Sequence, residues 1–141
     1  MNDATQITSE TSTPSGKQPP SLRLSSIERG IGSAAARFTA GPEHLNIKGM
    51  LHGGIIAGLM DVIMSIAAGS HPDPAKRQFS ITLSLSLNFI GSAGQGELVL
   101  RAETTGGGKR TCFCDGRIED SAGNPIATAQ GAFKLLDAGT E

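Results

Sequence analysis

At 141 residues, of which 38% are hydrophobic, the chain has the size and composition of one folded domain. Its formal net charge is -1, with acidic and basic residues mixed along the chain, so we expect no nucleic-acid-binding face. The absence of Trp and Tyr leaves only Phe to stack against bases, which argues in the same direction.

The N-terminal segment, residues 1–20, consists mainly of Ser, Thr, Gln, Asn and Pro. It offers too little apolar surface to offset the entropy lost on ordering, so we predict a disordered tail, followed by one domain over residues 21–138. The segment lacks the basic start and apolar core of a signal peptide, and the Arg-rich composition of a mitochondrial transit peptide. We therefore expect a cytoplasmic protein.

The first elements in chain order are two weak strands, followed by one long apolar helix. The strands are predicted over residues 22–28 and 32–39, and an irregular stretch over 41–51 leads into the helix. From residue 53 to residue 68 the chain reads GGIIAGLMDVIMSIAA, which is apolar nearly all round and typical of a buried helix. It is shorter than the about 20 residues that a membrane span needs, and it carries a charge in its middle. We therefore expect no membrane contact.

The second half of the chain is predicted to form four strands. In the first, residues 80–89, polar and apolar residues alternate strictly, as in a half-buried strand. This alternation predicts one face made of Ile81, Leu83, Leu85, Leu87 and Phe89 and another made of Ser80, Thr82, Ser84, Ser86 and Asn88. Three further strands, 97–105, 110–119 and 125–136, are separated by short turns and predict an antiparallel meander. One helix with an antiparallel sheet is an α+β pattern, and a sheet curled around the helix satisfies both periodicities.

The two cysteines, Cys112 and Cys114, fall within one of these strands. We expect them on opposite faces of the strand and therefore poorly placed to form a disulfide. Two cysteines without a nearby His also do not make a zinc site. We interpret both as small core residues of a protein from a reducing compartment.

Asp61 stands out because it is the only charged residue between Leu51 and Gly69. No Lys or Arg lies three or four residues away to pair with it, and burying an unpaired carboxylate is costly. A place at the edge of the domain, or hydrogen bonds to the backbone, would give it a purely structural role. The functional alternative is a carboxylate held in an apolar cleft as a base or nucleophile.

The sequence His52-Gly53-Gly54 stands where the helix begins. The first turn of a helix has free N–H groups and the positive end of the helix dipole, and glycines let a ligand come close to those groups. Such a site suits a thioester carbonyl oxygen that develops negative charge, with Gly54 as a further substrate contact.

The spacing between the two parts of this motif has a geometric consequence. Asp61 follows His52 by nine positions, which places them on opposite faces of the helix and about 13 Å apart along its axis. The two cannot close on one substrate atom within one chain. If both act on the same thioester, they must come from two subunits, so the motif indicates a symmetric dimer with two shared sites.

Residues 46–61, NIKGMLHGGIIAGLMD, resemble the hotdog-fold acyl-CoA thioesterases of the phenylacetate-pathway (PaaI-like) type. The segments SITLSLSLNFIG (80–91) and GNPIATAQGAF (123–133), and the glycine-rich turn before Lys109, are similar to that family too. The resemblance covers roughly residues 22–136. Its most specific part is the combined spacing of Asn46, Gly49, His52, Gly53, Gly54 and Asp61.

The resemblance implies hydrolysis of an acyl-CoA to the free acid and coenzyme A. Asp61 matches the acid that attacks the thioester or activates water to do so, and Gly53 matches the N–H donor to the thioester carbonyl. His52 matches a residue that shapes this turn and contacts the thioester region. Asn46 matches a residue that holds the water or the carbonyl, and Thr82 one that positions water. The resemblance further implies no metal or cofactor, and a tetramer built from two dimers.

Several of these residues also have ordinary structural explanations. Asn46 fits equally well as a turn residue, and Thr82 as a simple strand former. Lys109 and Arg110, beside a glycine turn, are either exposed charges or contacts to the phosphates of coenzyme A. The remaining histidines, His44 and His71, are expected at the surface or in loops.

Two rival functions stay open at this point. The first is a hydratase or dehydratase of the same fold, although the Asp-His pair and the His followed by Phe-Pro-Gly that such enzymes carry are absent. The second is a non-catalytic acyl-CoA-binding or sensor protein, which would keep the cleft without needing Asp61.

Overall fold

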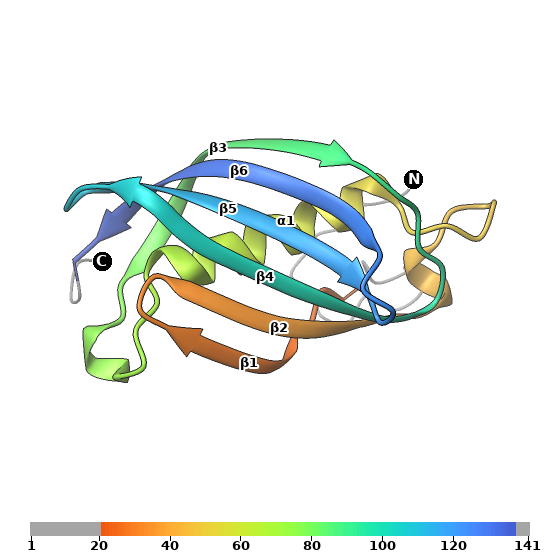
Figure 1. The fold of residues 1–141 in the computed structure, drawn as a ribbon, viewed down its shortest axis with the longest axis horizontal. Helices are drawn as coiled ribbons and strands as arrows, with labels where there is room; N and C mark the ends of the chain where they lie inside the picture. The colour runs from red at the N-terminus through yellow and green to blue at the C-terminus, as the bar shows by residue number, and fades with distance from the viewer. Residues whose placement is uncertain (1–20, 138–141) are drawn as a thin grey trace, which may run out of the picture.

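The computed structural model describes residues 21–137, so the predicted tail, residues 1–20, lies outside the described part. Figure 1 shows one long helix lying along a curved sheet. The elements are β1 (Ser25–Gly30), β2 (Ser33–Ala40), the short helix η1 (Pro42–His44), α1 (Gly53–Ala68), η2 (Pro74–Lys76), β3 (Phe79–Phe89), β4 (Gly96–Gly107), β5 (Thr111–Asp120) and β6 (Pro125–Leu136). The predicted helix has the observed bounds, and the six predicted strands are all present with slightly shifted ends.

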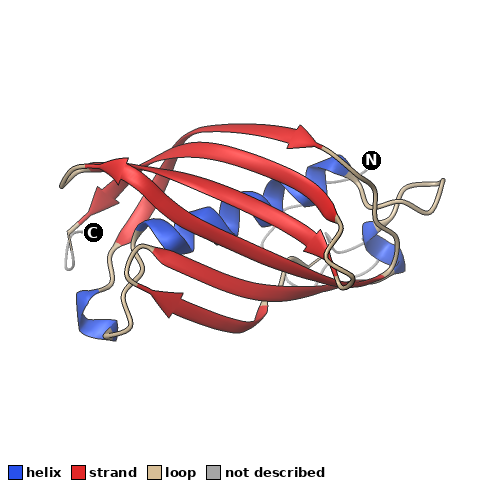
Figure 2. Ribbon diagram, in the orientation of Figure 1, coloured by secondary structure: helices blue, strands red, loops and turns tan. Residues whose placement is uncertain are grey.

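The six strands form one antiparallel sheet in the order β1-β2-β4-β5-β6-β3. β4, β5 and β6 are neighbours both in sequence and in the sheet, which confirms the predicted meander. β3 follows the helix and pairs with β6, so β1 and β3 form the two edges of the sheet (Figure 2). α1 packs against β2, β3, β4, β5 and β6, and the α+β prediction is confirmed.

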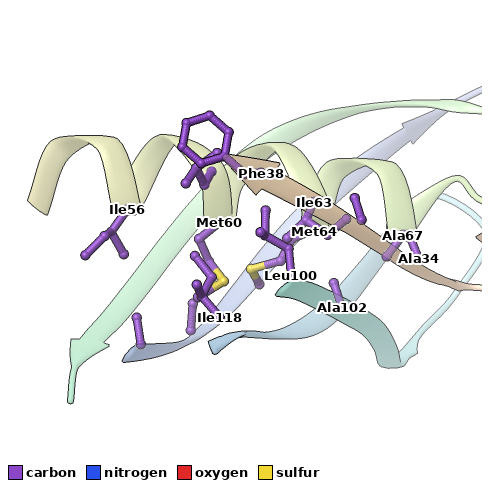
Figure 3. Close-up of a cluster of buried hydrophobic side chains, with 14 of the residues drawn as sticks. Ala34, Phe38, Ile56, Met60, Ile63, Met64, Ala67, Leu100, Ala102 and Ile118 are labelled. Carbon is purple, nitrogen blue, oxygen red and sulfur yellow. The ribbon is translucent and has the colours of Figure 1, made fainter. Parts of the chain in front are cut away.

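The core lies between α1 and the sheet. Met60 and Met64 are fully buried and point from the helix toward Leu100 and Ile118 on the strands (Figure 3). Burying a side chain of this size contributes about 1.5–3 kcal/mol. Gly116 on β5 permits the close approach, because a Cβ there would lie only 2.6 Å from the Met60 sulfur. Among the described residues, no helix is long and apolar enough to cross a membrane.

The two cysteines correct one expectation from the sequence. Cys112 and Cys114 are both buried on the helix-facing side of β5, and both are free thiols. The expectation of opposite faces is wrong, because residues two apart on a strand share a face. Their interpretation as small core residues holds.

A β-bulge in β3 corrects a second expectation. The register between β3 and β6 shifts between Thr82 and Ser84, so Leu83 is an extra residue in the strand. Thr82 lies opposite Phe133, which is fully buried, whereas Ser84 lies opposite Ala132 on the other face. The predicted assignment of side chains to the two faces of the strand is therefore wrong for the residues before the bulge.

The bulge decides which side chains of β3 face the helix. After it, Leu85 and Leu87 point inward as predicted and are half-buried. Before it, Ser80 and Thr82 take the inward positions, and Ile81 turns outward with 49% of its surface exposed. The first part of β3 thus presents hydroxyl groups, not aliphatic side chains, to α1.

Candidate active site

Asp61 lies on α1 where the helix borders β3. Its carboxylate Oδ1 accepts a hydrogen bond of 2.6 Å from Thr82 Oγ1, and the carboxylate is half-exposed. Within residues 21–137 it has no cationic partner and no other hydrogen-bond donor. The second carboxylate oxygen, Oδ2, therefore has no hydrogen-bond partner among the described residues.

The β3 bulge is what brings Thr82 to Asp61. Without the extra residue Leu83, the alternation of the strand would turn Thr82 to the outer face of the sheet. The helix contributes by placing its only acid on the side that faces β3. The sequence predicted both residues for the site but did not predict that they would touch.

The N-terminus of α1 carries two amides that no described group accepts. His52 is the residue before the first turn, and its carbonyl accepts hydrogen bonds from Ile55 N at 3.0 Å and Ile56 N at 3.1 Å. Within residues 21–137, the N–H groups of Gly53 and Gly54 have no acceptor. Both glycines are exposed, and a Cβ at Gly54 would meet nothing within 4 Å. These donors, at the positive end of the helix dipole, suit an oxyanion.

The loop before α1 is held by Asn46 and His44. The Asn46 Oδ1 accepts hydrogen bonds from Lys48 N at 2.8 Å and Met50 N at 3.1 Å, so this side-chain oxygen closes a turn. Its amide nitrogen has no partner among the described residues. Gly49 takes φ +77 in the same turn, a backbone conformation that favours glycine.

His44 was expected at the surface or in a loop, and this expectation is wrong. Only 3% of its surface is exposed. Its Nδ1 accepts a hydrogen bond from Gly41 N at 2.9 Å, and its Nε2 donates to Ser21 O at 2.9 Å. The ring packs edge-on against Phe38, and the His44 carbonyl accepts a hydrogen bond of 3.1 Å from His52 N. His44 thus positions the start of α1, a role that no sequence pattern indicated.

Lys109 and Arg110 lie in the hairpin between β4 and β5, and both are exposed. This hairpin sits at the same end of the molecule as the C-terminal end of α1 (Figure 1), and the two line a common hollow of about 370 Å³. Within one chain they are therefore at the opposite end of α1 from Gly53. They lie nearer to Thr82, because Thr111 of β5 and Ile81 of β3 both pair with Lys134 of β6.

The structure therefore joins only part of the predicted site within one chain. Asp61 and Thr82 touch, and His52, Gly53 and Gly54 form the start of the helix. Asp61 follows Gly53 by eight positions, which separates these two groups by about 12 Å along the helix axis. In the part of the chain from 21 to 137, no group of three or more His, Cys, Asp or Glu side chains could hold a metal ion.

Comparison with known proteins identifies the family. Residues 48–127, more than half of the chain, match the family model described as the thioesterase superfamily. The chain belongs to this superfamily. A protein of Archaeoglobus fulgidus named as an esterase is 30% identical over 106 residues, which is 74% of this chain and 66% of that protein's length. The match thus spans slightly less than two thirds of that relative.

Solved structures agree on the fold. A conserved protein of Pseudomonas aeruginosa is 28% identical, with a TM-score of 0.73 over 82% of this chain and 90% of its own. The E. coli PaaI protein from the phenylacetic acid degradation operon is 20% identical, with a TM-score of 0.69 over 78% and 79% of the two chains. A Streptococcus pneumoniae protein named as a thioesterase and solved with coenzyme A is 22% identical, with a TM-score of 0.68 over 79% and 84%.

These comparisons confirm two predictions from the sequence. The fold is the hotdog fold, a six-stranded antiparallel sheet around one helix. The resemblance to hotdog thioesterases of the PaaI-like type is confirmed.

Proposed function

We propose that this protein hydrolyses an acyl-CoA thioester to the free acid and coenzyme A, with Asp61 as the reactive carboxylate. The observation that carries the proposal is the setting of Asp61. It is the only charged residue of an otherwise apolar 16-residue helix, it is accessible beside β3, and Thr82 Oγ1 orients it at 2.6 Å. The superfamily match and the binding of coenzyme A by a thioesterase of the same fold support the substrate class.

The chemistry needs a base or nucleophile and a donor to the carbonyl oxygen. As a base, Asp61 takes a proton from water while the water oxygen adds to the thioester carbonyl carbon. As a nucleophile, it adds to that carbon itself, and water then hydrolyses the resulting anhydride. In both routes the C–S bond breaks, the sulfur takes up a proton as the thiol of coenzyme A, and the acid is released. The amides of Gly53 and Gly54 stabilise the oxyanion.

The separation of Asp61 from Gly53 requires two subunits for one site. About 12 Å of helix lies between them, which is too far for both to reach one carbonyl group. The edge strand β3 offers the means of pairing. It has 11 residues, it pairs on only one side within the described chain, and Leu83 is 56% exposed. A long edge strand with exposed apolar side chains is a template for pairing with another chain.

The positions of the two groups along β3 set the register of this dimer. Asp61 touches Thr82 near one end of the strand, whereas a Cβ at Gly53 would lie 3.6 Å from Phe89 at the other end. Asp61 meets the partner subunit's Gly53 when Thr82 lies opposite the partner subunit's Phe89. With Leu83 counted as the bulge residue, the two-fold axis of such an antiparallel pair passes through Ser86.

The remaining predicted contacts complete the proposal. Lys109 and Arg110, at the Thr82 end of the sheet, bind phosphates of coenzyme A. Two such dimers form the tetramer that the family resemblance implies, and sedimentation analysis measures this directly.

A thiol-release assay with a panel of acyl-CoA species tests the proposal. The wild-type protein should release coenzyme A, and Asp61→Asn should lower kcat by about a hundredfold or more, because the essential base or nucleophile is lost. Circular dichroism and thermal unfolding show whether the variant keeps its fold. A wild-type protein that binds acyl-CoA but releases no thiol would be a binding or sensor protein instead.

A further inference from the structure

A groove opens where the sheet leaves one side of α1 uncovered. Its volume is about 380 Å³, and it runs between the two edges of the sheet, because Arg29 of β1 and Phe79 of β3 both line it. The helix forms its floor through Ser65 and Ile66. Phe79 is 72% exposed, so the groove offers an open apolar surface along part of its length.

The groove begins one helical turn from Asp61. Ser65 follows Asp61 by four residues, which is about 6 Å along the helix and on the same face. Ser80 likewise precedes Thr82 by two residues on the same face of β3, and its hydroxyl donates a hydrogen bond of 3.0 Å to Ser65 O. Ser65 and Ser80 thus place the groove next to the site of the proposed reaction, although Asp61 and Thr82 do not line it.

Two arginines give the groove a positive charge. The Arg29 guanidinium has no hydrogen bond or ion pair within residues 21–137. Arg77 donates from Nε to His71 O at 2.9 Å and from Nη2 to Pro72 O at 3.4 Å. These carbonyls fix the guanidinium without neutralising it, and they leave further N–H groups unused. None of the described residues that line the groove is acidic.

We propose that Arg29 and Arg77 form an anion-binding subsite of the thioesterase cleft, which receives a carboxylate or phosphate oxygen group of the substrate. A planar guanidinium suits both groups through paired N–H donors. Arg77 is preorganised by its carbonyl contacts, and Arg29 donates to the anion from the opposite edge of the sheet. Ile66 and Phe79 contact the apolar part of the substrate that lies between the thioester and the anionic group. This proposal rests on the proposed function for the position of the thioester.

The anion has two sources, and four thioesters separate them. Adipyl and hexanoyl groups have equal chain length, but only adipyl ends in a carboxylate. Each is supplied as the coenzyme A thioester and as the N-acetylcysteamine thioester, which has no phosphate. We expect Arg29→Gln to lower kcat/KM about tenfold or more on the substrates that carry the bound anion. A loss on both adipyl substrates assigns the subsite to an acyl carboxylate, and a loss on both coenzyme A substrates assigns it to a phosphate.

Controls separate this subsite from its neighbours. Arg77→Gln should show the same pattern of losses. Because Arg77 also holds its loop through hydrogen bonds to His71 O and Pro72 O, Arg29→Gln is the variant that tests the subsite without disturbing this loop. Lys76→Gln is the matched control, since Lys76 is an exposed cation next to Arg77 that does not line the groove. It should change kcat/KM less than twofold on every substrate. Equal losses of Arg29→Gln on all four substrates, or no loss on any, would overturn the subsite.

A binding measurement distinguishes this proposal from the proposed function. Calorimetry with adipate and with free coenzyme A should show that Arg29→Gln weakens one of the two about tenfold relative to wild type. If the protein hydrolyses no thioester but this loss of binding is found, the proposed reaction is wrong and the subsite stands. If hydrolysis occurs and neither ligand loses affinity, the subsite is wrong.

Discussion

Thr82 Oγ1 donates a hydrogen bond of 2.6 Å to Asp61 Oδ1, although 21 residues separate them in the chain. The contact joins an edge strand to the only acid of the apolar helix. It depends on the bulge at Leu83, which turns Thr82 toward the helix. In the proposed reaction, Thr82 orients the carboxylate and leaves its second oxygen for water or thioester.

Removal of this hydroxyl group should slow the reaction without unfolding the protein. Thr82→Val keeps the shape of the side chain but loses the donor to a charged group, and kcat should fall about tenfold. Thr82→Ser keeps the donor and should stay within about threefold of wild type. Thr128→Val is the matched control, because Thr128 lies on the outer face of the sheet opposite Asn88. Steady-state kinetics in which Thr82→Val equals wild type would remove Thr82 from the site.

Much of this fold follows from the sequence. The helix over residues 53–68 is predicted at its observed bounds, because a 16-residue apolar run between glycines is typical of a buried helix. The strands follow from alternation and glycine-rich turns. The bulge at Leu83 does not, because its sequence LSLSL keeps the regular pattern. Pairing with β6 decides it, and that is a long-range effect.

The site is predictable in its parts but not in its contacts. Asp61 stands out as a lone charge, and His52-Gly53-Gly54 as a helix start. Which side of the helix stays open depends on how the sheet edges close around it, and no local pattern states this. For the same reason the groove between Arg29 and Arg77 appears only in three dimensions, since these arginines lie on segments far apart in the chain.

The register proposed for the dimer predicts where two copies cross-link. A cysteine at position 86 should form an intermolecular disulfide under mild oxidation, because the two-fold axis passes through this residue. Ser86→Cys should therefore run as a covalent dimer on a non-reducing gel. Asn88→Cys is the control on the same face, with the two copies about 14 Å apart along the strands. Cross-linking at 88 and not at 86 would exclude this register.

Lys109 and Arg110 should affect substrate binding more than the chemical step. Phosphate contacts are equal in the ground state and the transition state, so the double change to Ala should raise KM about tenfold while kcat stays within about twofold. The effect should disappear with thioesters of pantetheine, which lack the nucleotide. An equal loss on coenzyme A and pantetheine substrates would refute the assignment.

The buried thiols give a prediction on stability. Burial raises the pKa of Cys114 to about 12, with nearby Cys112 and Asp115 adding to the shift, and burial also raises the pKa of Cys112. The unfolded thiols ionise near their ordinary value of 9.0. Their contribution to stability is therefore complete below pH 9 and is lost as the pH rises from 9 toward 12.

Urea unfolding measures this effect. The urea concentration at the unfolding midpoint should decrease when the pH is raised from 8 to 10.5. Cys114→Ala should show a smaller decrease over the same range, although this variant is less stable than wild type at both pH values. At pH 8, iodoacetamide should modify the cysteines much faster in urea than in the folded protein. The same fall in both proteins would show that other groups cause the pH dependence.

The central claim is that Asp61 and the partner subunit's Gly53 act on one thioester, and subunit mixing tests it most directly. Asp61→Asn lacks the carboxylate, and Gly53→Leu fills the space where the carbonyl oxygen would sit, so each should be nearly inactive alone. In a mixed dimer, one site receives intact Asp61 and intact Gly53, while the other receives both defects. Once mass spectrometry has verified subunit exchange, thiol release per mixed dimer should return to about half of the wild-type rate. Verified mixed dimers that stay inactive would contradict a site shared between two subunits.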